Sequence, residues 1–144
     1  MKMGITGLVL LGALAIGPAA AADAPKPSPE AMAKAQEAYI AAINARDLNA
    51  ILALYADDAV VEDPVGSPPK RGKEIEAFYA NVVKGTPNLE IVTVNPSNGD
   101  SSAMHFQVKA GPVTIDVIDL MSFNAAGKIT SMRAYVKRPA APKP

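Results

Sequence analysis

The chain has 144 residues, with 14 Lys and Arg against 14 Asp and Glu, and it contains no cysteine. This length fits one domain, and the lack of cysteine excludes disulfides and thiol chemistry. A balanced charge without a basic patch argues against a nucleic-acid-binding surface.

Residues 1–22 have the pattern of a secretory signal peptide. Lys2 is the positive n-region, residues 4–17 form an apolar segment too short to span a membrane comfortably, and small residues follow up to Ala22. A retained N-terminal membrane anchor is the alternative. A lipid-anchored lipoprotein is excluded because it requires a cysteine. We expect cleavage after Ala22 and a periplasmic or secreted bacterial protein.

The remaining chain divides into a domain and two tails. Residues 23–30 and 137–144 are rich in Pro and Ala, lack the apolar content needed to pack, and are expected to be flexible. The domain itself is expected to span residues 31–136.

The first half of the domain predicts three helices. Ser28 caps the first, whose apolar stripe follows helical spacing; a short second helix begins after Asp47; a third runs from Lys73 to Lys84, with Gly85 as its cap. The stripe residues of the first and third helices are Met32, Ala35, Tyr39, Ile43, Ile75, Phe78, Tyr79 and Val82.

From Pro87 onward, the apolar pattern changes to a period of two, which is typical of strands. Four strands are expected, over residues 89–94, 102–110, 113–123 and 128–136. Helices followed by a strand meander indicate an α+β fold, with the helices packed on one face of an antiparallel sheet.

Asp63 ends a further apolar strand, just before Pro64. Side chains alternate along a strand, so Ala59, Val61 and Asp63 share one face. A carboxylate on an apolar face needs a partner or a task. Burial raises its pKa toward working pH, which suits proton transfer. The alternative is a carboxylate that caps a turn.

Tyr39 and Asp119 are the other candidates for the same site. Tyr39 lies on the stripe of the first helix, and Asp119 lies in a strand between Ile118 and Leu120. A core tyrosine and an edge-strand charge facing water are the alternatives. If both face inward, a base, a phenol and a second acid form one site.

Several motifs in order closely resemble bacterial ketosteroid isomerase (steroid Δ5-isomerase), of the SnoaL/NTF2-like superfamily, from about Ala35 to Tyr135. They are residues 41–48, 55–67, 78–79, 123–128 and 131–134. The resemblance implies three N-terminal helices on a curved antiparallel sheet that encloses a conical apolar cavity, and a homodimer.

The resemblance also implies a chemistry that needs no cofactor and no metal. Asp63 would be the base that shuttles a proton, and Tyr39 and a protonated Asp119 would donate to the oxyanion of a dienolate. Tyr55 and Tyr79 would form a supporting hydrogen-bond network. An acid kept neutral by an apolar site is the known property of this enzyme family. The substrate would be a 3-oxo-Δ5-steroid or another small apolar β,γ-unsaturated ketone.

Some features depart from this family. The hairpin at Gly111-Pro112 and the loop before the third helix are shorter, Val117 replaces a proline, and Val136 replaces a large aromatic residue. These changes bear on the substrate. Fold alone does not fix function, so a periplasmic binding module, a cyclase or dehydratase, and an interaction domain stay open.

Other polar residues are expected to be structural or solvated. His105 is the single histidine and is expected to be structural. The pair Asp57-Asp58 is expected in a solvated turn, Asp116 on the exposed face of its strand, and Lys70-Arg71 in a solvated loop.

Overall fold

The computed structural model describes residues 25–85 and 88–137. The expected signal peptide and all of the C-terminal tail beyond Lys137 lie outside these ranges. The described elements, in chain order, are α1 (Pro29–Ala45), α2 (Leu48–Leu52), β1 (Tyr55–Glu62), β2 (Lys70–Arg71), α3 (Lys73–Gly85), β3 (Asn88–Pro96), β4 (Ser101–Ala110), β5 (Val113–Phe123) and β6 (Ile129–Val136). Within those ranges, no helix has the length and apolar character needed to cross a membrane.

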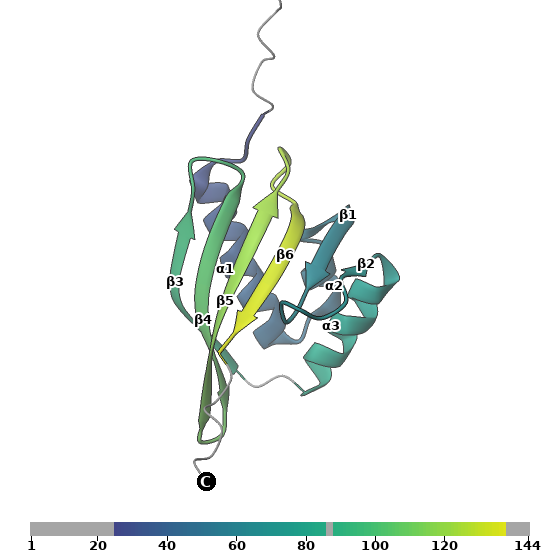
Figure 1. The fold of residues 1–144 in the computed structure, drawn as a ribbon, viewed down its shortest axis with the longest axis vertical. Helices are drawn as coiled ribbons and strands as arrows, with labels where there is room; N and C mark the ends of the chain where they lie inside the picture. Colours follow the sequence, from purple (N-terminus) through teal and green to yellow (C-terminus); the bar gives the residue numbers. More distant parts are fainter. Residues whose placement is uncertain (1–24, 86–87, 138–144) are drawn as a thin grey trace, which may run out of the picture.

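The strands form one six-stranded sheet in the order β2-β1-β6-β5-β4-β3, and the helices lie on one side of it, with α1 crossing behind β3, β4 and β5 (Figure 1). The predicted α+β class is therefore confirmed. The sheet is mixed rather than antiparallel throughout, because β1 runs parallel to β6. Parallel neighbours need a long connection, and here α3 and the β3–β5 meander supply it.

The helix boundaries follow their caps. The Ser28 hydroxyl accepts a hydrogen bond from the Ala31 amide at 3.1 Å, and Asp47 accepts from the Ala50 amide at 3.0 Å. Both caps were predicted, since short oxygen-bearing side chains satisfy the free amides of a first helical turn. Gly85 is the last residue of α3 rather than the residue that follows it.

Strand alternation gives the sheet two different faces. The inner face packs on the helices and carries buried residues of β4, β5 and β6, while Ile118 and Leu120 project outward and stay exposed. The inner residues that form the core with α1 include Met104, Phe106, Val117, Met121, Phe123 and Met132. Asp119 belongs to this inner face, whereas Asp116, three residues earlier, belongs to the outer face.

The acidic pair Asp57-Asp58 is exposed, as expected, but it lies within β1 and not in a turn. The pairing of β1 with β6 shifts register between Tyr55 and Val60. The pair occupies this irregular but extended stretch, which the sequence did not distinguish from a loop.

A buried polar pair joins α1 to β4. The Ser102 hydroxyl donates to Gln36 Oε1 at 2.6 Å, and Gln36 Nε2 donates to the Ser102 carbonyl at 3.3 Å. Both side chains are almost completely buried, so each satisfies a polar group that water cannot reach. This pair fixes α1 against the sheet on which the site is built.

Ser102→Ala should lower the free energy of unfolding by about 1–3 kcal/mol, because it leaves Gln36 Oε1 buried without a donor. Urea denaturation followed by circular dichroism measures the change. The control is Ser122→Ala, a half-buried serine of β5, which should stay within about 0.5 kcal/mol of the parent protein. Equal effects from both variants would contradict a role for the buried pair.

Candidate active site

An apolar cavity of about 370 Å³ lies between α1, α3 and the inner face of the sheet. Three of the polar residues predicted from the sequence line it: Tyr39 from α1, Asp63 just after β1, and Tyr79 from α3. The other lining residues are Ile43, Phe78, Asn81, Val82, Gly85, Leu89, Phe106, Val108, Ile115, Val117 and Val136. Apolar walls with a few convergent polar groups are typical of small-molecule sites.

Asp63 follows directly after β1, and the two inward residues before it, Ala59 and Val61, are buried as predicted. Burial raises the pKa of the Asp63 carboxyl above its usual value, and the Lys70 ammonium opposes this rise. The carboxylate accepts no hydrogen bond from any described residue, while its neighbour Glu62 caps the turn by accepting from the Gly66 amide at 2.7 Å. Asp63 is therefore a half-buried carboxylate open to the cavity.

The three buried tyrosines form one hydrogen-bonded chain. Tyr79 is its centre, with its hydroxyl 3.1 Å from that of Tyr39 and 2.5 Å from that of Tyr55. Burial, the largest cause, holds the pKa of all three phenols well above its ordinary value. Near neutral pH the phenols stay protonated, so each has one proton to donate.

Asp119 lies on β5, a central strand between β4 and β6, and is 1% exposed. Neither of its carboxyl oxygens has a hydrogen-bond partner among the described residues. Burial first, and then the nearby Asp63 carboxylate, raise the pKa of the Asp119 carboxyl well above its usual value. The side chain is thus a neutral acid held inside the protein, not an edge-strand charge facing water.

The two carboxyls of the site have unequal surroundings. Burial raises the pKa of each, but Asp63 keeps partial contact with solvent and has the Lys70 cation nearby, whereas Asp119 has neither. When two acids interact, the one in the less favourable environment keeps the proton. The arrangement therefore favours the charged carboxyl at Asp63 and the neutral carboxyl at Asp119.

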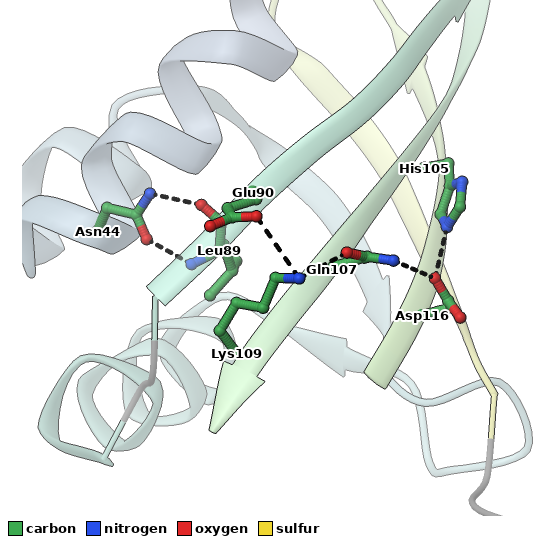
Figure 2. Close-up of polar contacts among 7 residues, drawn as sticks. All are labelled: Asn44, Leu89, Glu90, His105, Gln107, Lys109 and Asp116. Carbon is green, nitrogen blue, oxygen red and sulfur yellow. Dashed lines mark hydrogen bonds and ion pairs between the residues drawn. The ribbon is translucent and has the colours of Figure 1, made fainter. Parts of the chain in front are cut away.

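Two lining or adjacent residues were not identified from the sequence. Leu89 is held in the cavity wall by Asn44, whose side-chain amide donates to the Leu89 carbonyl at 2.9 Å and accepts from the Leu89 amide at 2.8 Å (Figure 2). Lys70 was expected in a solvated loop, but it lies in β2 and is half-buried beside Asp63. Neither contact is local in sequence, so no motif indicates it.

His105 and Asp116 lie on the outer face, away from the cavity. His105 Nε2 is 3.0 Å from Asp116 Oδ1, and Gln107 donates to the same oxygen (Figure 2). This agrees with a structural histidine, although Asp116 is half-buried by these contacts rather than fully exposed. Among residues 25–85 and 88–137, no group of three or more His, Cys, Asp or Glu side chains is placed to hold a metal ion.

Comparison with known proteins identifies the family. The model of the SnoaL-like domain matches residues 36–132. The chain belongs to the SnoaL-like domain family. A steroid Delta-isomerase of Nocardioides simplex is 40% identical over 102 residues, which cover 67% of this chain and 82% of that protein. This SnoaL-like chain is therefore a homologue of a steroid isomerase.

A solved structure agrees on the fold. It is that of SalBIII, an epoxide hydrolase/cyclase-like enzyme in pyran ring formation in polyether salinomycin. The TM-score is 0.67 with 20% identity, over 75% of this chain and 92% of that one. At this identity the likeness shows the fold alone.

The raised pKa of the Asp119 carboxyl predicts how the stability of the protein depends on pH. The folded state holds the Asp119 proton more tightly than the unfolded chain does. This contribution to stability is therefore fully present below the unfolded pKa of about 4 and is lost as pH rises toward the folded pKa. Asp119→Asn should gain stability relative to the parent protein as pH rises from 4 to 8, measured by urea denaturation at each pH.

Asp116→Asn provides a control of opposite sign on the same strand. The hydrogen bond from His105, the largest cause, lowers the pKa of the Asp116 carboxyl. Its contribution is present above the unfolded pKa and is lost as pH falls, so Asp116→Asn should lose stability relative to the parent as pH rises. A pH-independent difference for Asp119→Asn would mean that Asp119 is not held neutral by the fold.

Proposed function

We propose that this protein is a steroid Δ-isomerase, which moves a C=C bond from Δ5 to Δ4 in a 3-oxosteroid or a similar β,γ-unsaturated ketone. The observation that carries the proposal is an apolar cavity lined by Tyr39 and the open carboxylate Asp63, with a buried, unpartnered acid, Asp119, near enough to Asp63 for the charge of Asp63 to raise its pKa. The identity to the Nocardioides simplex steroid isomerase supports it.

The reaction needs one base and two donors. The Asp63 carboxylate takes a proton from the carbon between the carbonyl and the double bond, and the electron pair of that C–H bond forms a dienolate. Its negative charge lies on the former carbonyl oxygen. Asp63 then returns the same proton to the far carbon of the dienolate, which leaves a conjugated ketone. No atom is gained or lost, and no redox change occurs.

Tyr39 and Asp119 are assigned as the oxyanion donors. Both are buried and protonated near neutral pH, so both can donate to the dienolate oxygen. Fixed donors in a water-excluded site are worth about 3–4 kcal/mol each in transition-state stabilisation. With Tyr39 donating to the substrate, Tyr79 donates to Tyr39 and Tyr55 donates to Tyr79, and the developing charge is shared along the chain.

The cavity suits a compact apolar ketone. Its volume of about 370 Å³ lies at the lower end of the usual range for small-molecule pockets, and its walls are mainly aliphatic and aromatic. Val136 lines the wall at the end of β6. A small side chain there leaves room that a large aromatic residue would fill.

Asp63→Asn should lower kcat by about 10²- to 10⁴-fold, because the amide cannot accept the proton. The assay follows ultraviolet absorbance as a Δ5-3-ketosteroid becomes a conjugated enone. Binding of a phenolic steroid, which needs only the donors, should persist in Asp63→Asn. Exposed Asp57→Asn on β1 is the matched control and should keep parental turnover.

The assay also separates the rival functions. Ligand binding by the parent protein without turnover above buffer would favour a periplasmic binding module. Turnover retained by Asp63→Asn would mean that another group is the base.

We further propose that the outer face of the sheet joins two copies of the chain. The helices cover only the inner face, and the outer face presents three large apolar side chains, Ile118, Leu120 and Tyr135, with exposures of 47%, 38% and 44%. Both charge signs occur beside them, including the pair of Arg133 with Glu62 at 2.8 Å. An apolar centre flanked by both charges can complement itself across a two-fold axis.

The pattern of residues 1–22 supports action after export, in the periplasm or outside the cell.

Ile118→Asp should convert a dimer into a monomer, because it places two charges in the proposed contact. Size-exclusion chromatography with light scattering measures the mass. The control is Val92→Asp on edge strand β3, also an exposed apolar residue at 52%, which should remain dimeric. A monomeric parent protein at micromolar concentration would rule out the dimer.

A further inference from the structure

Lys70 is held beside Asp63 by two neutral partners. It lies in β2, which pairs antiparallel with β1 so that Lys70 is opposite Val61. Its ammonium donates a hydrogen bond to the Asp63 main-chain carbonyl at 3.2 Å and lies 4.8 Å from the centre of the Phe78 ring. A cation over an aromatic ring is attracted to the ring's negative face.

The charge of Lys70 is not neutralised locally. Among the described residues, no carboxylate oxygen lies within 4.0 Å of its nitrogen; the ion pairs found there use His105, Lys109, Arg133 and Lys137. The side chain is half-buried, so solvent screens it less than a fully exposed lysine. A full positive charge therefore acts on its surroundings.

Asp63 has few other charged neighbours. Its charge raises the pKa of three buried groups: Asp119 from β5, Tyr39 from α1 and Tyr55 from β1. Each of the three is neutral near pH 7 because burial keeps it protonated. Glu62, next in the chain, is paired with Arg133 of β6. Among residues 25–85 and 88–137, Lys70 is thus the charged side chain that lowers the pKa of the Asp63 carboxyl.

We propose that Lys70 is a positioning residue for the isomerase reaction, which fixes the main chain at Asp63 and keeps the carboxylate of the base ionised inside an apolar cavity. The inference rests on the proposed function. Burial favours the neutral carboxyl, which cannot accept a proton, and a nearby fixed cation favours the charged form. Lys70 acts through Asp63 and does not contact the reacting atoms.

The contact also connects the base to the donor side of the cavity. Phe78, whose ring faces the Lys70 ammonium, lines the cavity. Its ring also packs edge-on against that of Tyr79, with the ring centres 5.0 Å apart. Tyr79 is the centre of the phenol chain. One cation thus bridges the segment of the base and the helix that carries the oxyanion network.

The test is the pH profile of kcat/KM for Lys70→Met, with Lys70→Arg as the conservative rescue. The rise of kcat/KM with pH reports ionisation of the base, and in Lys70→Met this rise should occur at higher pH. At pH values below the pKa of the base, kcat/KM should therefore fall by about 3- to 10-fold relative to the parent protein. Activity at pH values above that pKa should be largely kept. Lys70→Arg should restore the parental profile, whereas a merely structural defect would lower kcat/KM by one factor at every pH.

Lys128→Met is the matched control. Lys128 also donates to a main-chain carbonyl, that of Ala53, but it is exposed and does not line the cavity. Its profile should superimpose on that of the parent protein. Lys70→Gln, which keeps a donor and loses the charge, takes the place of Lys70→Met if the methionine variant does not fold.

A second readout separates this inference from the proposed function. The ¹³C resonance of the Asp63 carboxyl, assigned with Asp63→Asn, is titrated in the parent protein and in Lys70→Met. The role of Lys70 would be overturned if the parent protein is active, and if the pH profile of kcat/KM and the midpoint of the Asp63 titration are both unchanged in Lys70→Met. A parent protein without turnover, but with a midpoint that moves upward in Lys70→Met, would overturn the isomerase assignment and leave the electrostatic role of Lys70 in place.

Discussion

The burial of Asp119 without a hydrogen-bond partner among the described residues is the constraint on which the site depends. An ionised carboxylate in such surroundings is far less stable than a protonated one. The fold therefore retains a neutral acid where most proteins would place an apolar residue or a paired charge. In the proposed function, this neutral acid would serve as a hydrogen-bond donor to the substrate oxygen.

The inner face of the sheet and the helices packed on it bury Asp119. Alternation along β5 turns Asp119 inward between Val117 and Met121, while α1 and α3 bring Tyr39 and Tyr79 to the cavity, with their hydroxyls 3.1 Å apart. The buried pair of Gln36 and Ser102 fixes α1 on β4. Because donors gain strength only when held in place without reorganisation, these packing contacts belong to the chemistry as much as to stability.

The sequence predicted much of this, for physical reasons that differ between residues. The caps at Ser28 and Asp47 and the inward faces of Ala59 and Val61 are local patterns, and they were found. The parallel pairing of β1 with β6 was missed because strand order is a long-range property. The half-burial of Lys70 was missed for the same reason, since it depends on the pairing of the two-residue strand β2 with β1 and carries no periodic signal.

Charge conservation explains why these groups suit enolate chemistry. In the proposed reaction, proton transfer from the ketone would neutralise Asp63 and place one negative charge on the substrate oxygen, so the cavity would hold a single negative charge before and after the step. A low-dielectric site tolerates moving a charge better than creating one. In that reaction an ionised Asp119 would repel the new charge on the substrate oxygen, whereas a neutral acid and a phenol would donate hydrogen bonds to it. Delivery of the proton to the far carbon would reform the Asp63 carboxylate, and the Lys70 cation bound to the Asp63 main chain would favour that charged form.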